Sequence, residues 1–197
     1  MTYSRIANII INMILKPQDI VILLKIIVWD EARKDGDVWF IGDTPQEKWT
    51  YQSLSVELFM SSAEVHAGIK RAAQAGFIHL PTRLIITKAL EEFLVHGVKY
   101  AFPPDRGGMT RGLATSYAGP PLENVLIYGQ DPLPVWPHPD GPTRGLAFSP
   151  LYKTVPKAAI RDQHLYEMLA LVDAIRDGKA RETALAVKEL KKRLGTA

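Results

Sequence analysis

The sequence of 197 residues contains no cysteine. Disulfide bonds, cysteine nucleophiles and thiolate metal sites are therefore excluded, and a reducing compartment suits the chain. A strong charge of one sign is also missing, because 24 basic side chains are balanced by 21 acidic ones and the net charge is +3. Up to residue 100 the sequence holds about 11 basic and 11 acidic residues, and the basic excess lies after residue 150. A neutral N-terminal half disfavours non-specific binding to phosphates.

Long apolar runs are lacking too. Residues 6–15 and 20–29 are apolar or nearly so, but polar residues interrupt them and neither reaches the ~20 residues that a membrane span needs. No small-residue cleavage site follows the first run, so we expect a cytoplasmic protein without a membrane partner. A translation start at Met13 would make the first dozen residues extraneous.

Motifs for catalysis and metal binding are absent. The five histidines form no His-Glu-x-x-His or His-x-His pair, and neither a Gly-x-Ser-x-Gly elbow nor a phosphate-binding loop occurs. The adjacent pairs Asp30-Glu31 and Glu91-Glu92 point apart around a helix, which makes them poor acid–base pairs. We therefore expect no enzymatic activity, no metal and no cofactor.

Residues 50–78 carry the most informative spacing. Two short segments with apolar residues at helical intervals are separated by a Met-Ser-Ser turn, which predicts two helices joined by a tight turn. Ser61 or Ser62 is a suitable N-cap for the second helix, and Gly76 is a suitable end. The second helix of such a unit can enter the major groove of DNA. The apolar positions are Leu54 and Leu58 in the first segment and Val65, Ile69 and Ala72 in the second.

This stretch resembles the DNA-reading unit of MarR-like winged helix-turn-helix regulators. The resemblance covers roughly residues 16–102, about half of the chain, and departs from the family at Gly68 and Ala72, where larger aliphatic residues are common. The matching positions are Met60, Ser61-Ser62, Val65, Ile69 and Gly76-Phe77-Ile78.

The rest of residues 1–102 fits a winged helix-turn-helix domain. Pro17 starts a helix with an apolar stripe through Val28, and the runs 77–80 and 84–87 predict a hairpin, the wing, with Arg83 near its tip. A further helix is predicted over residues 89–100. A polar loop connects the first predicted helix to residue 50. Three of its aromatic residues are expected to cover the core, namely Trp39, Phe40 and Trp49.

Residues 103–156 are rich in proline and glycine, which excludes sustained helix but leaves too many apolar residues for a free linker. We predict an ordered, irregular segment with a β-hairpin from 135–136 through 140–141 to 146–148. Its stretch 106–112 predicts either a turn with exposed arginines or a basic arm. Residues that line an effector pocket in one interpretation are Tyr117, Tyr128 and Trp136.

Residues 157–197 predict a C-terminal helical hairpin, with helices over 158–177 and 181–194. Such a pair of helices either packs against its twin in a two-fold dimer or covers the core of its own chain. The complete fold is thus expected to be α+β and mainly α, in three segments: 1–102, 103–156 and 157–197.

The resemblance implies a sequence-specific regulator of transcription that binds double-stranded DNA, and we expect a homodimer. The alternative is a winged-helix module for protein–protein contact, such as an antitoxin or assembly subunit, without direct DNA readout. An unknown protein partner or a small-molecule effector is compatible with either. The predicted DNA-binding residues are Gln52, Ser53, Ser61, Ser62, Glu64, His66, Ala67, Lys70, Arg71, Arg83, Arg106 and Arg111.

Overall fold

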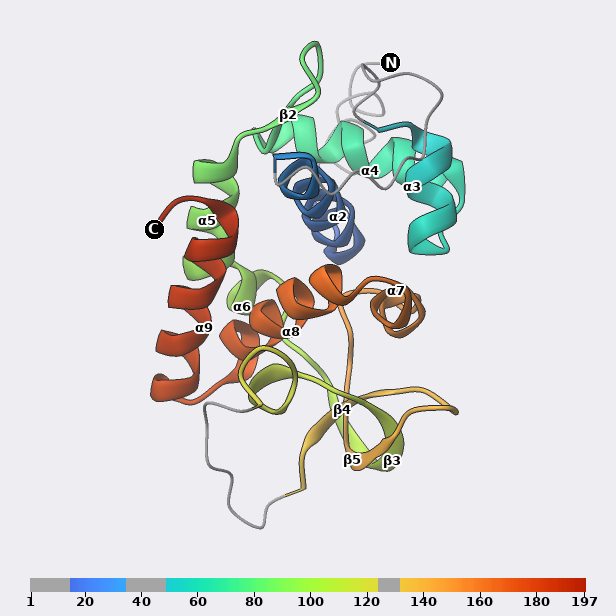
Figure 1. Cartoon of the computed structure of the whole chain (residues 1–197), viewed down its shortest axis with the longest axis vertical. Coiled ribbons are helices and arrows are strands. Elements are labelled where there is room, and N and C mark those ends of the chain that lie inside the picture. The colour runs from blue at the N-terminus through green and yellow to red at the C-terminus, as the bar shows by residue number, and fades with distance from the viewer. Residues whose placement is uncertain (1–14, 35–48, 124–131) are drawn as a thin grey trace, which may run out of the picture. The chain divides into compact units, whose positions relative to one another are not determined.

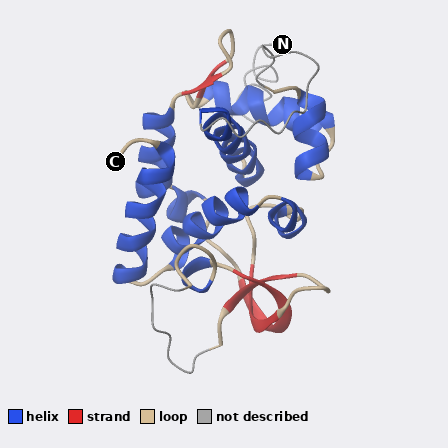
Figure 2. Ribbon diagram, in the orientation of Figure 1, coloured by secondary structure: helices blue, strands red, loops and turns tan. Residues whose placement is uncertain are grey.

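The computed structural model describes residues 15–34, 49–123 and 132–197. The fold is α+β and mainly helical, as the sequence predicts. In the described part, strands are confined to one hairpin and one three-stranded sheet (Figure 1, Figure 2). The chain forms two compact units, Met1–Ala89 and Leu90–Ala197. The three-segment division predicted from the sequence stays a prediction, and Trp39, Phe40 and Tyr128 lie outside the described residues.

The first unit contains three described helices and a hairpin. Helix α2 (Pro17–Lys34) starts at the predicted proline, and α3 (Tyr51–Leu58) and α4 (Ser62–Gln74) are the two predicted helices joined by a tight turn. Strands β1 (Ile78–His79) and β2 (Leu84–Ile85) pair in antiparallel fashion, which confirms the hairpin.

Reciprocal caps fix the starts of α3 and α4. The Thr50 hydroxyl accepts from the Ser53 amide at 2.9 Å, while the Ser53 hydroxyl accepts from the Thr50 amide at 3.0 Å. Ser61, one of the two predicted caps, accepts from the Glu64 amide, and the Glu64 carboxylate accepts from the Ser61 amide. Each box satisfies two amide protons that the first helical turn leaves unpaired. Gly76 follows α4 with φ +78°, a backbone conformation that glycine adopts without strain.

Helices α2 and α4 approach closely at Gly68. A Cβ at this position would lie 2.6 Å from Cδ1 of Ile22 and 2.9 Å from Oδ1 of Asp19. A side chain at position 68 would therefore require Ile22 and Asp19 to move, so glycine suits this close approach. Val65 and Ile69, on the same side of α4, are fully buried.

The second unit contains the remaining elements. Helix α5 (Thr87–His96) spans the limit between the units, and α6 (Val98–Ala101) follows it, so the single helix predicted over 89–100 is broken at Gly97. The strands are β3 (Arg106–Ala114), β4 (Pro134–Pro137) and β5 (Thr143–Phe148), with a 3-10 turn, η1 (Ser116–Ala118), after β3. The C-terminal helices are α7 (Val155–Arg161), α8 (Gln163–Asp177) and α9 (Ala180–Leu194).

The β-hairpin predicted within residues 103–156 is wrong. Strands β4 and β5 exist, but each pairs in antiparallel fashion with β3, and they pair with one another in parallel, which closes the sheet on itself. The stretch 106–112, predicted as a turn or an arm, is most of strand β3. A Cβ on Gly141 would collide with the backbone of Gly112, so the β4–β5 connection passes against β3 where both residues are glycine.

The long helix predicted over residues 158–177 is two helices. The chain is extended at Asp162 (φ −135°, ψ 103°), where α7 ends and α8 begins. The Asp162 carboxylate accepts from the Leu165 amide at 3.0 Å and so caps α8. Helix α9 lies within one residue of its predicted limits and packs against α8.

A buried carboxylate ties the sheet to α8. Asp173 is 1% exposed and accepts from Thr115 Oγ1 at 2.9 Å, Trp136 Nε1 at 2.6 Å and Arg176 Nη1 at 2.5 Å. Burial raises the pKa of Asp173, and these three donors oppose the shift by stabilising the charged form. Burial also raises the pKa of Tyr166 to about 12, so its phenol stays protonated and donates to the Ala114 carbonyl.

Candidate nucleic-acid interface

The turn between α3 and α4 is short and fully specified by hydrogen bonds. Phe59 has a left-handed backbone (φ 54°, ψ 38°) and ends α3, and the Met60 amide donates to the Ser55 carbonyl at 3.0 Å. The capping box of Ser61 then starts α4 at once. Local hydrogen bonds thus define the turn, and the packing of α4 on α2 supports the direction in which α4 leaves it.

Helix α4 has one buried and one exposed face. Val65, Gly68, Ile69 and Ala72 are buried, as their spacing predicts. The opposite face presents exposed residues three or four positions apart, so they line one side of the helix. These exposed residues are Ala63, His66, Lys70 and Gln74.

Several polar side chains predicted to contact DNA form hydrogen bonds at the ends of their own helices. Ser53, Ser61 and Glu64 form the capping boxes. The Ser62 hydroxyl lies within hydrogen-bond distance of Gln52 Oε1 (3.0 Å) and Ser55 Oγ (3.2 Å), which ties the start of α4 to α3. These groups build the helix-turn-helix and hold its turn closed.

Arg71 is engaged within its own unit. Its Nε and Nη2 atoms donate to the two carboxylate oxygens of Asp19 at 2.8 and 2.6 Å, and Asp19 is fully buried. These hydrogen bonds and the charge of Asp19 raise the pKa of Arg71, against the opposing effect of burial. A bidentate pair of this kind is among the stronger polar contacts in proteins. The sequence did not indicate this contact, because its partner lies 52 residues away.

His66 and Lys70 remain directed outward. His66 is exposed and lies edge-on to the Tyr51 ring, with centroids 5.1 Å apart. Ala67, the predicted site residue beside it, is half-buried. Lys70 is exposed and has no ion-pair partner among the described residues. Gln74, which extends the same face one turn further, was missed, although its spacing of four from Lys70 could have found it.

The hairpin predicted as a wing exposes apolar side chains, and its arginine is bonded within the chain. Arg83 has a left-handed backbone (φ 56°), donates from Nη1 to the Trp49 carbonyl at 2.8 Å and lies over the Trp49 ring. Its guanidinium is thus held by Trp49, which is buried as a residue covering the core should be. The hairpin exposes apolar side chains instead. These are Leu80, Leu84 and Ile86.

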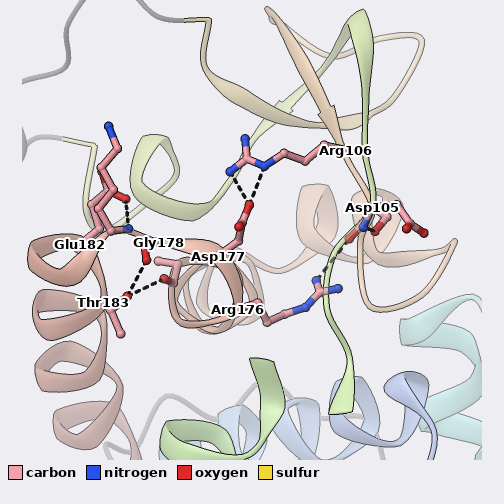
Figure 3. Close-up of polar contacts among 10 residues, drawn as sticks. Asp105, Arg106, Arg176, Asp177, Gly178, Glu182 and Thr183 are labelled. Carbon is pink, nitrogen blue, oxygen red and sulfur yellow. Dashed lines mark hydrogen bonds and ion pairs between the residues drawn. The ribbon is translucent and has the colours of Figure 1, made fainter. Parts of the chain in front are cut away.

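The two remaining predicted arginines belong to the second unit and differ from one another. Arg106 donates from Nε to Asp177 at 2.6 Å, and its Nη2 contacts the same carboxylate (Figure 3). Arg111 is exposed on β3, directly opposite Arg144 of β5, and neither has an ion-pair partner in the part of the chain that is described. Arg144 was not predicted as a site residue, since only strand register brings it beside Arg111.

No family model, no curated protein and no solved structure matches this chain. Within the described ranges, no cluster of three or more acidic or histidine side chains is placed to hold a metal ion. None of the helices in those ranges combines the length and apolarity that a membrane crossing requires.

Proposed function

We propose that the protein is a sequence-specific, double-stranded-DNA-binding transcriptional regulator of the winged helix-turn-helix type that acts as a cytoplasmic homodimer. The outward face of α4 carries the proposal. His66, Lys70 and Gln74 stand on one side of a helix whose other side is buried and whose entry is fixed by capping. An amide and an imidazole can bond base edges, and an ammonium can hold phosphate or guanine.

Charge argues for two copies. With Arg71 bonded to Asp19 and Arg83 to Trp49, Lys70 is the cation that α4 presents outward. One lysine supplies little of the phosphate neutralisation that holds DNA. A two-fold dimer doubles this contribution and reads two half-sites separated by a multiple of the ~34–36 Å helical turn. A palindromic operator is therefore expected.

Selection from a random duplex library with the purified protein tests the proposal. An enriched palindromic motif is expected, and Gln74→Ala should cost about 1–3 kcal/mol on that motif while leaving unrelated duplexes unaffected. Lys70→Gln should weaken binding to the selected motif and to unrelated duplexes alike. The matched control is Lys88→Gln, an exposed lysine on α5 at the end of the same unit. Absence of any motif, or an equal loss in the control, would contradict the proposal.

A second candidate is a protein-binding winged helix, and the exposed side chains of the hairpin favour it. Leu80, Leu84 and Ile86 are 43–46% exposed, an apolar group where a DNA-contacting wing would place cations. In this case the protein should pass through a DNA column at low salt. The variant Leu84→Ser with Ile86→Ser should then abolish binding of the protein partner, while His66→Ala with Lys70→Gln should not.

A further inference from the structure

Two arginines stand side by side on the small sheet of the second unit. Arg111 on β3 and Arg144 on β5 are directly opposite in an antiparallel pair, so their side chains leave the same face of the sheet. Their Cα atoms are expected to lie about 4.5–5.5 Å apart. Like charges at directly opposite positions destabilise a sheet. The arrangement is therefore unfavourable for folding alone.

Four other described arginines are neutralised, whereas Arg181 on α9 is exposed like the pair but has no arginine directly opposite it. Arg71, Arg106, Arg176 and Arg193 each donate to at least one carboxylate of the chain. Arg111 and Arg144 are both exposed and have neither a hydrogen-bond nor an ion-pair partner for their guanidinium groups in the described residues. Ten donors on two adjacent guanidiniums therefore face solvent, since each fork carries five.

The backbone beneath the pair is held in place. A Cβ on Gly112 would collide with the Trp136 carbonyl, and one on Gly145 with the Leu133 carbonyl, so both glycines lie against neighbouring strands. These glycines directly follow Arg111 and Arg144 in the sequence. Closely packed strands fix the positions from which the two side chains extend, and such a support reduces the entropy lost when a ligand is bound.

The groups around the pair are one imidazole, one carboxylate and one apolar pair. The His138 amide donates to the Arg111 carbonyl at 3.1 Å, and its Nδ1 accepts from the Asp140 amide at 3.3 Å. Asp140 is the acidic residue of the β4–β5 connection and is exposed. Met109 opposes Leu146 two residues along the same strands.

We propose that the Arg111–Arg144 pair binds the phosphodiester backbone of double-stranded DNA without reading its sequence. Guanidinium forks match phosphate oxygens bidentately, and a pair on adjacent strands can engage about two phosphates. The pair lies on an exposed face of the sheet, whereas small phosphorylated ligands are usually enclosed in concave sites. An extended polyanion suits such a surface. The inference rests on the proposed function and supplies the charge that α4 lacks.

The test is the salt dependence of DNA binding, measured by fluorescence anisotropy on a selected duplex and an unrelated duplex. In a bound homodimer, Arg111→Gln with Arg144→Gln should make the slope of log K against log salt less negative by about 3.6, which is 0.9 for each of two phosphate contacts per protomer. Affinity should fall by the same factor for both duplexes. The control Lys188→Gln with Lys192→Gln removes the same charge from exposed positions on α9 and should leave the slope unchanged. An unchanged slope in the arginine variant, or an equal loss in the control, would overturn the inference.

The variant of α4, Gln74→Ala, separates the two proposals. If Gln74→Ala still discriminates between the duplexes while the arginine variant has a less negative slope, the proposal that α4 reads the sequence fails and the sheet contact stands. If discrimination is lost in the α4 variant while the arginine variant keeps the wild-type slope, the reverse holds. Thermal unfolding without DNA is the control for folding. The arginine variant should have an unchanged or higher Tm, because a like-charge pair is removed, and a lower Tm would show a structural role and overturn the inference.

Discussion

One pair of arginines from each unit shows two opposite environments. In the first unit, Arg71 lies on α4 and Arg83 in the turn between β1 and β2, and Asp19 and the Trp49 carbonyl hold their guanidinium groups. In the second unit, Arg111 and Arg144 lie on a sheet with no obvious likeness to a DNA-reading element, and their charges remain exposed and unpaired in the described part. Whether a charged side chain is available to a ligand therefore depends on its partners within the chain as much as on its position in a motif.

The largest effect is expected where a buried ion pair is broken in the second unit. Asp173→Ala leaves Arg176, at 3% side-chain exposure, with the Phe102 and Ser149 carbonyls but without a counter-charge, and removes the acceptor of Thr115 and Trp136. We expect a loss of roughly 3–5 kcal/mol in the free energy of unfolding, because a buried charge then lacks compensation. Urea denaturation monitored by circular dichroism measures this. A loss below about 1 kcal/mol would contradict the assigned role of the carboxylate.

Arg71→Ala should have a similar but smaller effect in the first unit. Asp19 would stay fully buried without its partner, although Arg71 itself is 12% exposed and water can reach the vacated space. We expect about 3 kcal/mol, at the lower end of the range for a broken buried pair. The same denaturation measurement applies. If Arg71→Ala weakens DNA binding while stability is unchanged, Arg71 would contact DNA in the way proposed for Arg111 and Arg144.

Gly68→Ala tests the contact between α2 and α4 that brings Asp19 to Arg71. The added methyl group would meet Cδ1 of Ile22 at 2.6 Å and Oδ1 of Asp19 at 2.9 Å, so these buried side chains or α2 must move. Alanine favours helix, but overpacking of a close contact is expected to dominate, with a loss of about 1–3 kcal/mol. Gly108→Ala, in the second unit where a Cβ would meet no neighbour within 4 Å, is the matched control. Equal effects would exclude the packing explanation.

The smallest effect is expected for Arg106→Ala. Its pair with Asp177 is 48% and 34% exposed at the two side chains, so solvent screens it. We expect a loss of about 0–1 kcal/mol. Arg111→Ala should cause no loss in the free energy of unfolding, because it removes the like-charge repulsion between Arg111 and Arg144. Measured side by side, the two variants separate an arginine that has an internal partner from one that has none.

The sequence predicted local features well because short-range chemistry sets them. Pro17 at the start of α2, the Ser61 cap, the apolar face of α4 and the hairpin around Arg83 each follow from residues within a few positions of one another. The break at Asp162 could have been found in the same way, since the carboxylate caps Leu165.

What the sequence could not predict depends on distant partners. The apolar runs around Val135 and Leu146 are typical of two strands that pair with one another in a hairpin. Each of these strands pairs in antiparallel fashion with β3, so the predicted hairpin was wrong. The glycines at 107, 108 and 112 suggested a turn, although Gly112 serves close backbone approach within a strand. The Asp19–Arg71 contact spans 52 residues and the Arg111–Arg144 pairing needs the register, so neither was evident from spacing.

The acceptor role of Asp173 also has a consequence for the growing chain on the ribosome. Thr115 precedes its acceptor by 58 residues, which at roughly 5–20 residues per second delays the bond by roughly 3–12 s. The first unit can complete its helix-turn-helix well before this time. During the delay the closed β3–β5 sheet lacks the helix that covers Trp136, and transiently exposed apolar surface makes incomplete chains prone to aggregation. Synthesis that stalls before α8 should therefore yield a folded first unit and an aggregation-prone second one.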